Sequence, residues 1–129
     1  MYDNIIFSAY KNESDTVFGP GYLEEFNGFL TNFGNGFILS DGTFTAQREG
    51  KYEFSAAANS ATIDPAFLAV EHNGAIVLSF YTYSADDALS FSWIMELQQG
   101  DTVRLKVTSG AFNCGPNYNC IFSGKLINN

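Results

Sequence analysis

The chain has 129 residues and a formal net charge of −8 at neutral pH, with 46% hydrophobic and 16% charged residues. Its length predicts one domain, because compact domains most often have roughly 100–150 residues. The hydrophobic content excludes a disordered chain, and no apolar run of about 18 residues is present to span a membrane. The acidic charge disfavours nucleic acid and anionic lipid as partners.

Several segments show the alternation of polar and apolar residues that is typical of half-buried strands. Residues 51–56 read Lys-Tyr-Glu-Phe-Ser-Ala, and residues 102–108 read Thr-Val-Arg-Leu-Lys-Val-Thr. Residues 75–83 and 91–97 have large apolar or aromatic side chains at both sets of alternate positions. We therefore expect these two strands to be covered on both faces.

Turn signals separate the expected strands at short intervals, and no segment favours a helix. Asn-Gly between two apolar runs is the strongest of them, because a type I′ turn needs positive φ at both central residues. Many short strands with such turns predict an antiparallel sandwich or jelly roll. The signals are Gly19-Pro20-Gly21, Gly34-Asn35-Gly36, Asp41-Gly42, Gly50, Asn73-Gly74, Gly100-Asp101 and Gly110.

In a sandwich of this size, one sheet covers only one face of the other. The aromatic outer faces of 75–83 and 91–97 would then lie against solvent and form a larger patch than a monomer usually exposes. A covering loop is the simpler explanation, but we favour oligomerisation, because obligate interfaces resemble a bisected core.

The only cysteines, Cys114 and Cys120, are separated by Gly-Pro-Asn-Tyr-Asn, a composition that favours a tight loop with adjacent ends. We predict that they form a disulfide, which indicates an oxidising compartment. Free thiols in a cytosolic protein, or half of a metal site, are the alternatives. Asn113, Asn117 and Tyr118 offer amides and an aromatic face on this loop, which serves either to bind a ligand or only to stabilise the chain.

Seven short motifs follow one another in a characteristic order. They are Phe7-Ser8-Ala9, Asn32-x-Gly34-x-x-Phe37, Gly42-x-Phe44-Thr45-Ala46, Gly50-x-Tyr52-x-Phe54-Ser55, Asn73-Gly74, Leu97-x-x-Gly100-Asp101-x-Val103-x-Leu105 and Phe122-Ser123-Gly124-x-Leu126. The series resembles the C1q globular domain over nearly the whole chain, and in particular the stand-alone invertebrate lectin type.

The resemblance implies one domain over residues 1–129, an all-β, ten-stranded antiparallel jelly roll that assembles as a homotrimer. It also implies that aromatic strand faces meet at the three-fold axis. We expect Gly34, Gly42 and Gly50 to occupy turns where a Cβ would clash. Phe122 and Leu126 should close the last strand against the first. The collagen-like stalk of many family members is absent from this sequence.

No arrangement typical of an enzyme is present, and we predict that the chain is not one and needs no cofactor. His72, the sole histidine, is expected to be an exposed residue of the hairpin. Some family members bind calcium near the trimer apex, where this sequence offers only Asp86 and Asp87. A hard cation prefers six to eight oxygen ligands, so a solvated turn is the favoured interpretation of this pair.

Two functions remain open. The first is a secreted, extracellular lectin of innate immunity that binds N-acetylated sugars, either acetylated hexosamines or sialic acids. The second is a protein-binding signalling or scaffolding head of the cerebellin or adiponectin type. The absence of a stalk, the wealth of Asn, Ser and Tyr and the lack of a basic loop cluster favour the lectin. The expected carbohydrate-binding residues are Asn113, Asn117, Tyr118, Tyr81, Tyr83 and Asp87.

Overall fold

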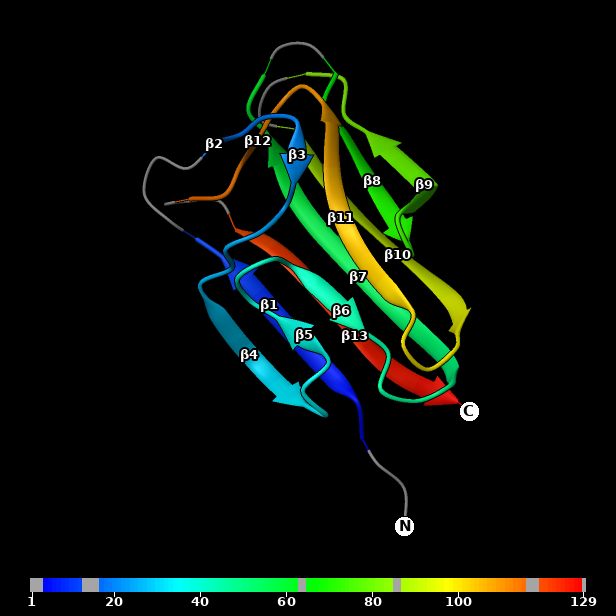
Figure 1. Cartoon of the computed structure of the whole chain (residues 1–129). Helices are drawn as coiled ribbons and strands as arrows, with labels where there is room; N and C mark the ends of the chain where they lie inside the picture. The colour runs from blue at the N-terminus through cyan, green and yellow to red at the C-terminus, as the bar shows by residue number, and fades with distance from the viewer. Residues whose placement is uncertain (1–3, 13–16, 63–64, 85–86, 116–118, 129) are drawn as a thin grey trace.

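The computed structural model describes residues 4–12, 17–62, 65–84, 87–115 and 119–128. Within these ranges, antiparallel strands form two sheets that pack face to face as a sandwich (Figure 1). The all-β jelly-roll prediction is therefore confirmed. No helix among the described residues has the length and apolarity that crossing a membrane requires.

The first sheet contains seven strands in the order β2-β12-β7-β13-β1-β4, and β10 pairs with the other edge of β7. Its last strand, β13, pairs with its first long strand, β1, as expected. The strands are β1 (Ile6–Lys11), β2 (Val17–Phe18), β4 (Gly28–Phe33), β7 (Gly50–Ser60), β10 (Ala88–Leu97), β12 (Phe112–Asn113) and β13 (Cys120–Asn128).

The second sheet has the order β5-β6-β11-β8-β9, and the short strand β3 also pairs with β11. The strands are β3 (Gly21–Tyr22), β5 (Phe37–Ile38), β6 (Thr43–Thr45), β8 (Phe67–His72), β9 (Ala75–Tyr81) and β11 (Thr102–Ser109). The described ranges contain thirteen strands rather than the expected ten, and four of them, β2, β3, β5 and β12, are ladders of only two residues.

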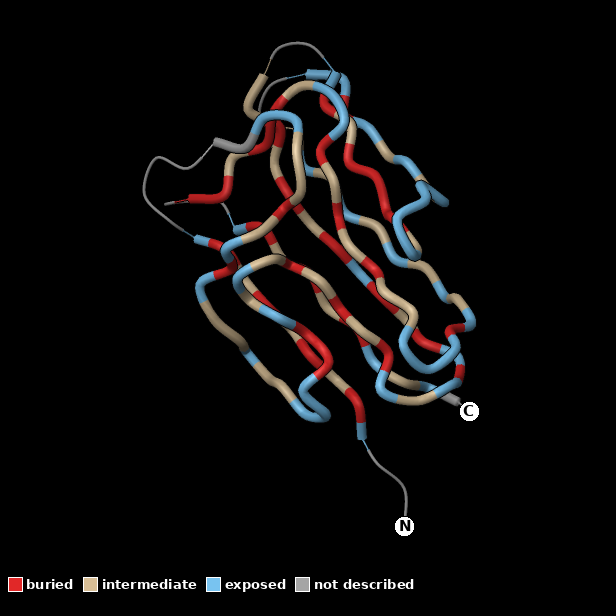
Figure 2. Tube along the Cα trace, viewed as in Figure 1, coloured by how far each residue is buried: buried red, intermediate tan, exposed pale blue. Residues whose placement is uncertain are grey.

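The alternation in the sequence identifies the core correctly in β7 and β11. Tyr52, Phe54 and Ala56 are buried, and the residues between them are exposed or half-buried. Val103, Leu105 and Val107 are buried in the same way from the other sheet. Figure 2 shows the resulting alternation of buried and more exposed positions along the strands.

The expectation for 91–97 is wrong. Phe91, Trp93 and Met95 point inward and pack, half-buried, against the core, while Ser92, Ile94 and Glu96 form the outer face of β10. The Phe91 ring stacks on Phe80 of β9, with 3.9 Å between the centroids, and so joins the edges of the two sheets. In 75–83 the expectation of exposed aromatics holds, because Tyr81 is 48% and Tyr83 73% exposed.

The turns behave as the sequence predicts, with one exception. Asn73 and Gly74 have φ values of 52° and 85°, which is the type I′ pattern. Gly34 and Gly42 also have positive φ, and a Cβ at either position would crowd neighbouring atoms. Gly50, by contrast, is the first residue of β7 rather than part of a turn.

We predict that Gly42→Ala destabilises the fold by about 2–4 kcal/mol. The new methyl group would clash with the Leu23 carbonyl oxygen, and φ at position 42 is +71°. Gly100→Ala is the matched control, because φ there is +92° but no atom lies within 4 Å of the new Cβ. Urea unfolding should therefore show a clearly larger loss for Gly42→Ala, and equal losses would contradict the steric argument.

Candidate functional site

Several of the expected binding residues lie at one end of the sandwich, the upper end in Figure 1. There β7 and β9 end, and β8 and β10 begin. Asn59 of β7 is paired with Ala88 of β10 on one side and with Asn113 of β12 on the other. Neighbouring strands are about 4.8 Å apart, so Asn113 lies about 10 Å from the start of β10.

The disulfide between Cys114 and Cys120 forms as predicted, with 5.0 Å between the Cα atoms and both residues buried. A ring of this size stabilises the folded chain by about 2 kcal/mol. The Asn113 side chain helps to shape the loop, since its Oδ1 accepts a hydrogen bond of 3.2 Å from the Gly115 N–H. Asn117 and Tyr118, the other expected residues of this loop, lie outside the described residues.

The second group of expected residues forms an aromatic corner, which we define as Phe67, Tyr81 and Tyr83. Phe67 is paired with Tyr81 across β8 and β9, and their rings stack with 5.2 Å between centroids. The Tyr83 ring meets Tyr81 edge-on at 5.2 Å. The two tyrosine hydroxyls are 3.0 Å apart, and this hydrogen bond raises the pKa of Tyr81 above its ordinary value. The corner presents aromatic ring surface beside two hydroxyl groups.

Asp87, which follows Tyr83 by four residues, forms hydrogen bonds to the backbone of the aromatic corner. Its Oδ2 accepts hydrogen bonds from the backbone N–H groups of Tyr83 and Ser84, at 3.2 and 3.0 Å, and from the Ser84 hydroxyl at 3.2 Å. This carboxylate therefore shapes a turn. Asp86, the other candidate calcium ligand, lies outside the described residues. Across the described part of the chain, no three His, Cys, Asp or Glu side chains are grouped closely enough to hold a metal ion.

The disulfide loop and the aromatic corner share an end of the molecule but not a face. Asn113 and Asn59 occupy outward positions of the seven-stranded sheet, whereas Phe67 and Tyr81 occupy outward positions of the six-stranded sheet. Within one chain they therefore cannot form a single pocket. Sequence reasoning missed Asn59 and Phe67. The alternation of β7 marks Asn59 as an outward residue, whereas residues 67–70 are all apolar and give no such signal for Phe67.

A shallow depression of about 290 Å³ lies elsewhere, on the outer face of the seven-stranded sheet. Its floor includes hydroxyl side chains, and the Glu53–Lys125 ion pair of 3.7 Å borders it. Five hydroxyl residues face one another in a row across five strands. In spatial order they are Thr31, Ser8, Ser123, Ser55 and Ser92.

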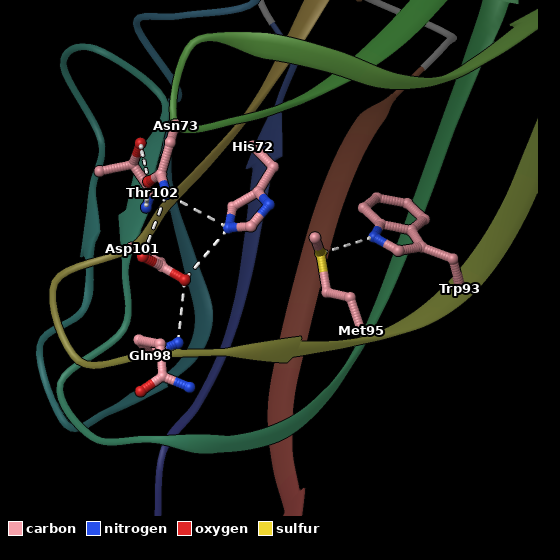
Figure 3. Close-up of polar contacts among 7 residues, drawn as sticks. All are labelled: His72, Asn73, Trp93, Met95, Gln98, Asp101 and Thr102. Carbon is pink, nitrogen blue, oxygen red and sulfur yellow. Dashed lines mark hydrogen bonds and ion pairs between the residues drawn. The ribbon is translucent and has the colours of Figure 1, made fainter.

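Asp101 joins the turn after β10 to the hairpin tip between β8 and β9 (Figure 3). Its carboxylate accepts hydrogen bonds from the Gln98 N–H at 2.9 Å and the Asn73 side-chain amide at 3.1 Å, and lies 3.1 Å from His72 Nε2. These contacts, with Gln98 first, hold the pKa of Asp101 below its ordinary value. The Asn73 Oδ1 in turn accepts the Thr102 N–H at 2.8 Å.

His72 is therefore not the exposed residue that the sequence suggested. It does precede the Asn73-Gly74 turn, but its side chain is half-buried and paired with Asp101. Asp101 is distant in sequence, so the local pattern around the histidine did not reveal the pair. The Asp101 contacts connect two turns at the end of the sandwich opposite the aromatic corner. Since their polar groups bond to one another, they stabilise the fold rather than form a binding site.

We predict that Asp101→Asn lowers the free energy of unfolding at pH 7 by about 1–2 kcal/mol, because charged hydrogen bonds are lost. The pKa of Asp101 is lower in the folded chain than in the unfolded chain, so the charged carboxylate stabilises the fold at pH values above the unfolded-state pKa. This stabilisation is lost as the pH falls through the folded-state pKa. The unfolding free energies of parent and variant, measured with urea, should therefore begin to converge as the pH falls below about 4, and they should meet once the pH has passed the folded-state pKa. A constant difference between pH 7 and pH 3 would contradict this account.

Comparison with known proteins identifies the domain. The family model described as C1q domain matches residues 6–127. The globular domain of zebrafish complement 1qA protein superposes with a TM-score of 0.74 at 26% identity, covering 97% of this chain and 98% of that one. Murine APRIL, at pH 5.0, superposes with a TM-score of 0.75 at 10% identity over 96% and 99% of the two chains, a likeness of fold alone. No curated protein matches the sequence.

Proposed function

The chain belongs to the C1q domain family, and we propose that it is a secreted carbohydrate-binding protein of innate immunity that recognises N-acetylated sugars. Proteins of this family are typically secreted, and they act in complement and in signalling rather than as enzymes. That this chain is no enzyme and uses no cofactor stays a prediction. The invertebrate lectin subtype is likewise part of the proposal.

The aromatic corner is the observation that carries the proposal. A pyranose has a face of C–H groups that packs on an aromatic ring, and its hydroxyls need hydrogen-bond partners beside that ring. Tyr81 and Tyr83 supply both, because their rings are exposed and their hydroxyls lie 3.0 Å apart. Phe67 stacks under Tyr81 and fixes the orientation of its ring. An N-acetyl group adds a methyl group for the ring surface and an amide for the hydroxyls.

A protein-binding head remains the second candidate, and one observation favours it. Tyr81 and Tyr83 continue an exposed apolar edge strand that includes Ile76 and Val77, which are 53% and 46% exposed. Tyrosine surrounded by apolar residues is the composition of protein-binding hot spots. Binding of a glycan-free protein with no binding to any glycan would establish this alternative.

A glycan array, probed with and without EDTA, tests the proposal. We expect binding to N-acetylhexosamine glycans that EDTA leaves unchanged, with dissociation constants of about 0.1–1 mM per site. Tyr83→Ala should weaken binding about tenfold or more, because a stacking surface is removed. Phe33→Ala is the matched control, since Phe33 is a 60% exposed aromatic at the end of β4, and β4 ends at the opposite end of the sandwich from the corner (Figure 1). Equal losses in both variants would place the site elsewhere.

The disulfide loop provides the rival location for the same function. Asn117→Ala and Tyr118→Ala should each abolish agglutination of cells if that loop holds the sugar, while the assembly stays intact. If these variants agglutinate like the parent and Tyr83→Ala does not, the aromatic corner is the site. If all three agglutinate like the parent, neither location is correct.

We also propose that the chain forms a homotrimer. Trimers are typical of this family, and apolar side chains remain exposed on β9 and β10, including Ile94 at 62%. Light scattering should give a mass near three chains at micromolar concentration. Ile94→Glu should shift the mass towards one chain, because a charge would be buried without a partner. Ile38→Glu, on the distant β5, should leave the mass unchanged, and a monomeric parent would refute the proposal.

A further inference from the structure

We infer that the aromatic corner selects its ligand by charge: it accepts neutral and cationic sugars and rejects sialic acids. This inference rests on the proposed function, and it narrows the sugar class. Its basis is the placement of charged side chains around Phe67, Tyr81 and Tyr83. Every lysine and arginine of the chain belongs to the described residues, so their positions relative to the corner are known.

Each of the six cations is placed away from the corner or bound to an acidic or carbonyl partner. Lys11 is buried, and its ammonium donates to the Glu25 carbonyl oxygen. Lys125 pairs with Glu53, and Arg104 lies 3.8 Å from Glu24. Arg48 precedes β7, and Lys51 is near the beginning of that strand, whereas the corner lies at the end where β7 finishes.

Lys106 is the cation that comes closest in the strand register. It is paired with Ala69 on β8, two residues from Phe67, on the outer face of the same sheet. Its ammonium is directed to Glu71, at 3.8 Å, on the far side of Ala69 from Phe67. Tyr22 holds this arrangement, because its hydroxyl donates to Glu71 and its ring lies under the Lys106 ammonium at 5.2 Å. The Lys106 ammonium is therefore paired with Glu71 and directed away from the corner.

The charge at the corner is instead negative. The Asp87 carboxylate accepts a hydrogen bond of 3.2 Å from the Tyr83 backbone N–H, so a negative charge is held at the backbone of this corner residue. The Tyr81 and Tyr83 hydroxyls are hydrogen-bonded to each other at 3.0 Å, and this bond raises the pKa of Tyr81. The corner thus combines exposed aromatic ring surface, two hydroxyls and one carboxylate.

We expect these groups to distinguish, by their charge, between sugars that share the same acetamido group. A sialic acid brings a carboxylate, which here finds no cation and meets both the Asp87 charge and the net charge of −8 of the chain. An N-acetylhexosamine has the acetamido group without the charge. A hexosamine with a free ammonium gains attraction from the carboxylate and from the tyrosine ring faces. Coulomb repulsion between the carboxylate of the sugar and that of Asp87 should weaken binding of the sialic acid by about fivefold or more.

The test compares three monosaccharides on one carrier protein: glucosamine, N-acetylglucosamine and N-acetylneuraminic acid. At low salt we expect N-acetylneuraminic acid to bind about fivefold or more weakly than either glucosamine or N-acetylglucosamine. The difference should shrink as salt is added, because exposed charges are screened. Equal or tighter binding of N-acetylneuraminic acid overturns the inference and leaves the proposed function standing. Absence of binding to all three removes both.

A gain-of-charge variant tests the same point in the opposite direction. Ser79 is exposed on β9, two residues before Tyr81 and on the same face, so Ser79→Lys places an ammonium beside the corner. We expect this variant to bind N-acetylneuraminic acid at least fivefold more tightly than the parent. Ser40→Lys, at an exposed position in the segment between β5 and β6, adds the same charge to the chain as a whole and should have little effect. Equal gains in both variants would show that net charge, rather than the corner, decides selectivity.

Discussion

The packing of phenylalanine rings between the two sheets is the constraint on which the rest of the structure depends. Phe7 of the seven-stranded sheet stacks on Phe37 and Phe44 of the other sheet, with centroids 4.6 and 5.2 Å apart. Phe122 meets Phe7 edge-on at 5.2 Å. Gly124 leaves room for these rings, because a Cβ there would approach Phe54 and Phe7 to 2.6–2.7 Å. The sheets are therefore joined by rings whose positions fix the strand register.

That register explains the hydroxyl row on the outer face. Four strands, β1, β7, β10 and β13, each contain a Phe-Ser dipeptide, at 7–8, 54–55, 91–92 and 122–123. Alternation sends each phenylalanine inward and each serine outward. In the antiparallel ladders Ser8 is paired with Ser123, Ser123 with Ser55, and Ser55 with Ser92, so the four serines meet directly across the strands. The four phenylalanines lie one residue to either side of this row, alternately from strand to strand. The repeated dipeptide is a sequence signal for this row, but only the strand order shows that the serines are neighbours.

Local sequence signals could predict part of the structure, whereas features that depend on the strand order could not be predicted. Alternation in 51–56 and 102–108 identified the core, and Asn73-Gly74 identified its turn, because both signals are local. The outer face of 91–97 was misjudged, since Phe91 and Trp93 find their partners in Phe80 and Phe54, on strands that the local pattern does not bring together. His72 and Asp101 were likewise connected only by the fold. The division of the candidate residues between two faces also depends on the strand order.

The location of the aromatic corner connects recognition with assembly. Among the described strands, β9 is the last of its sheet, and an edge strand with exposed apolar side chains tends to pair or aggregate unless another surface covers it. Ile76 lies at the beginning of β9 and Tyr81 at its end, about 16 Å apart at the rise of an extended strand. A neighbouring copy that covers the first part of β9 can therefore leave the corner open at its border. In the proposed homotrimer, three weak sites gain avidity through multivalency, so the modest affinity proposed for each corner is compatible with firm binding to a surface that displays many copies of one sugar.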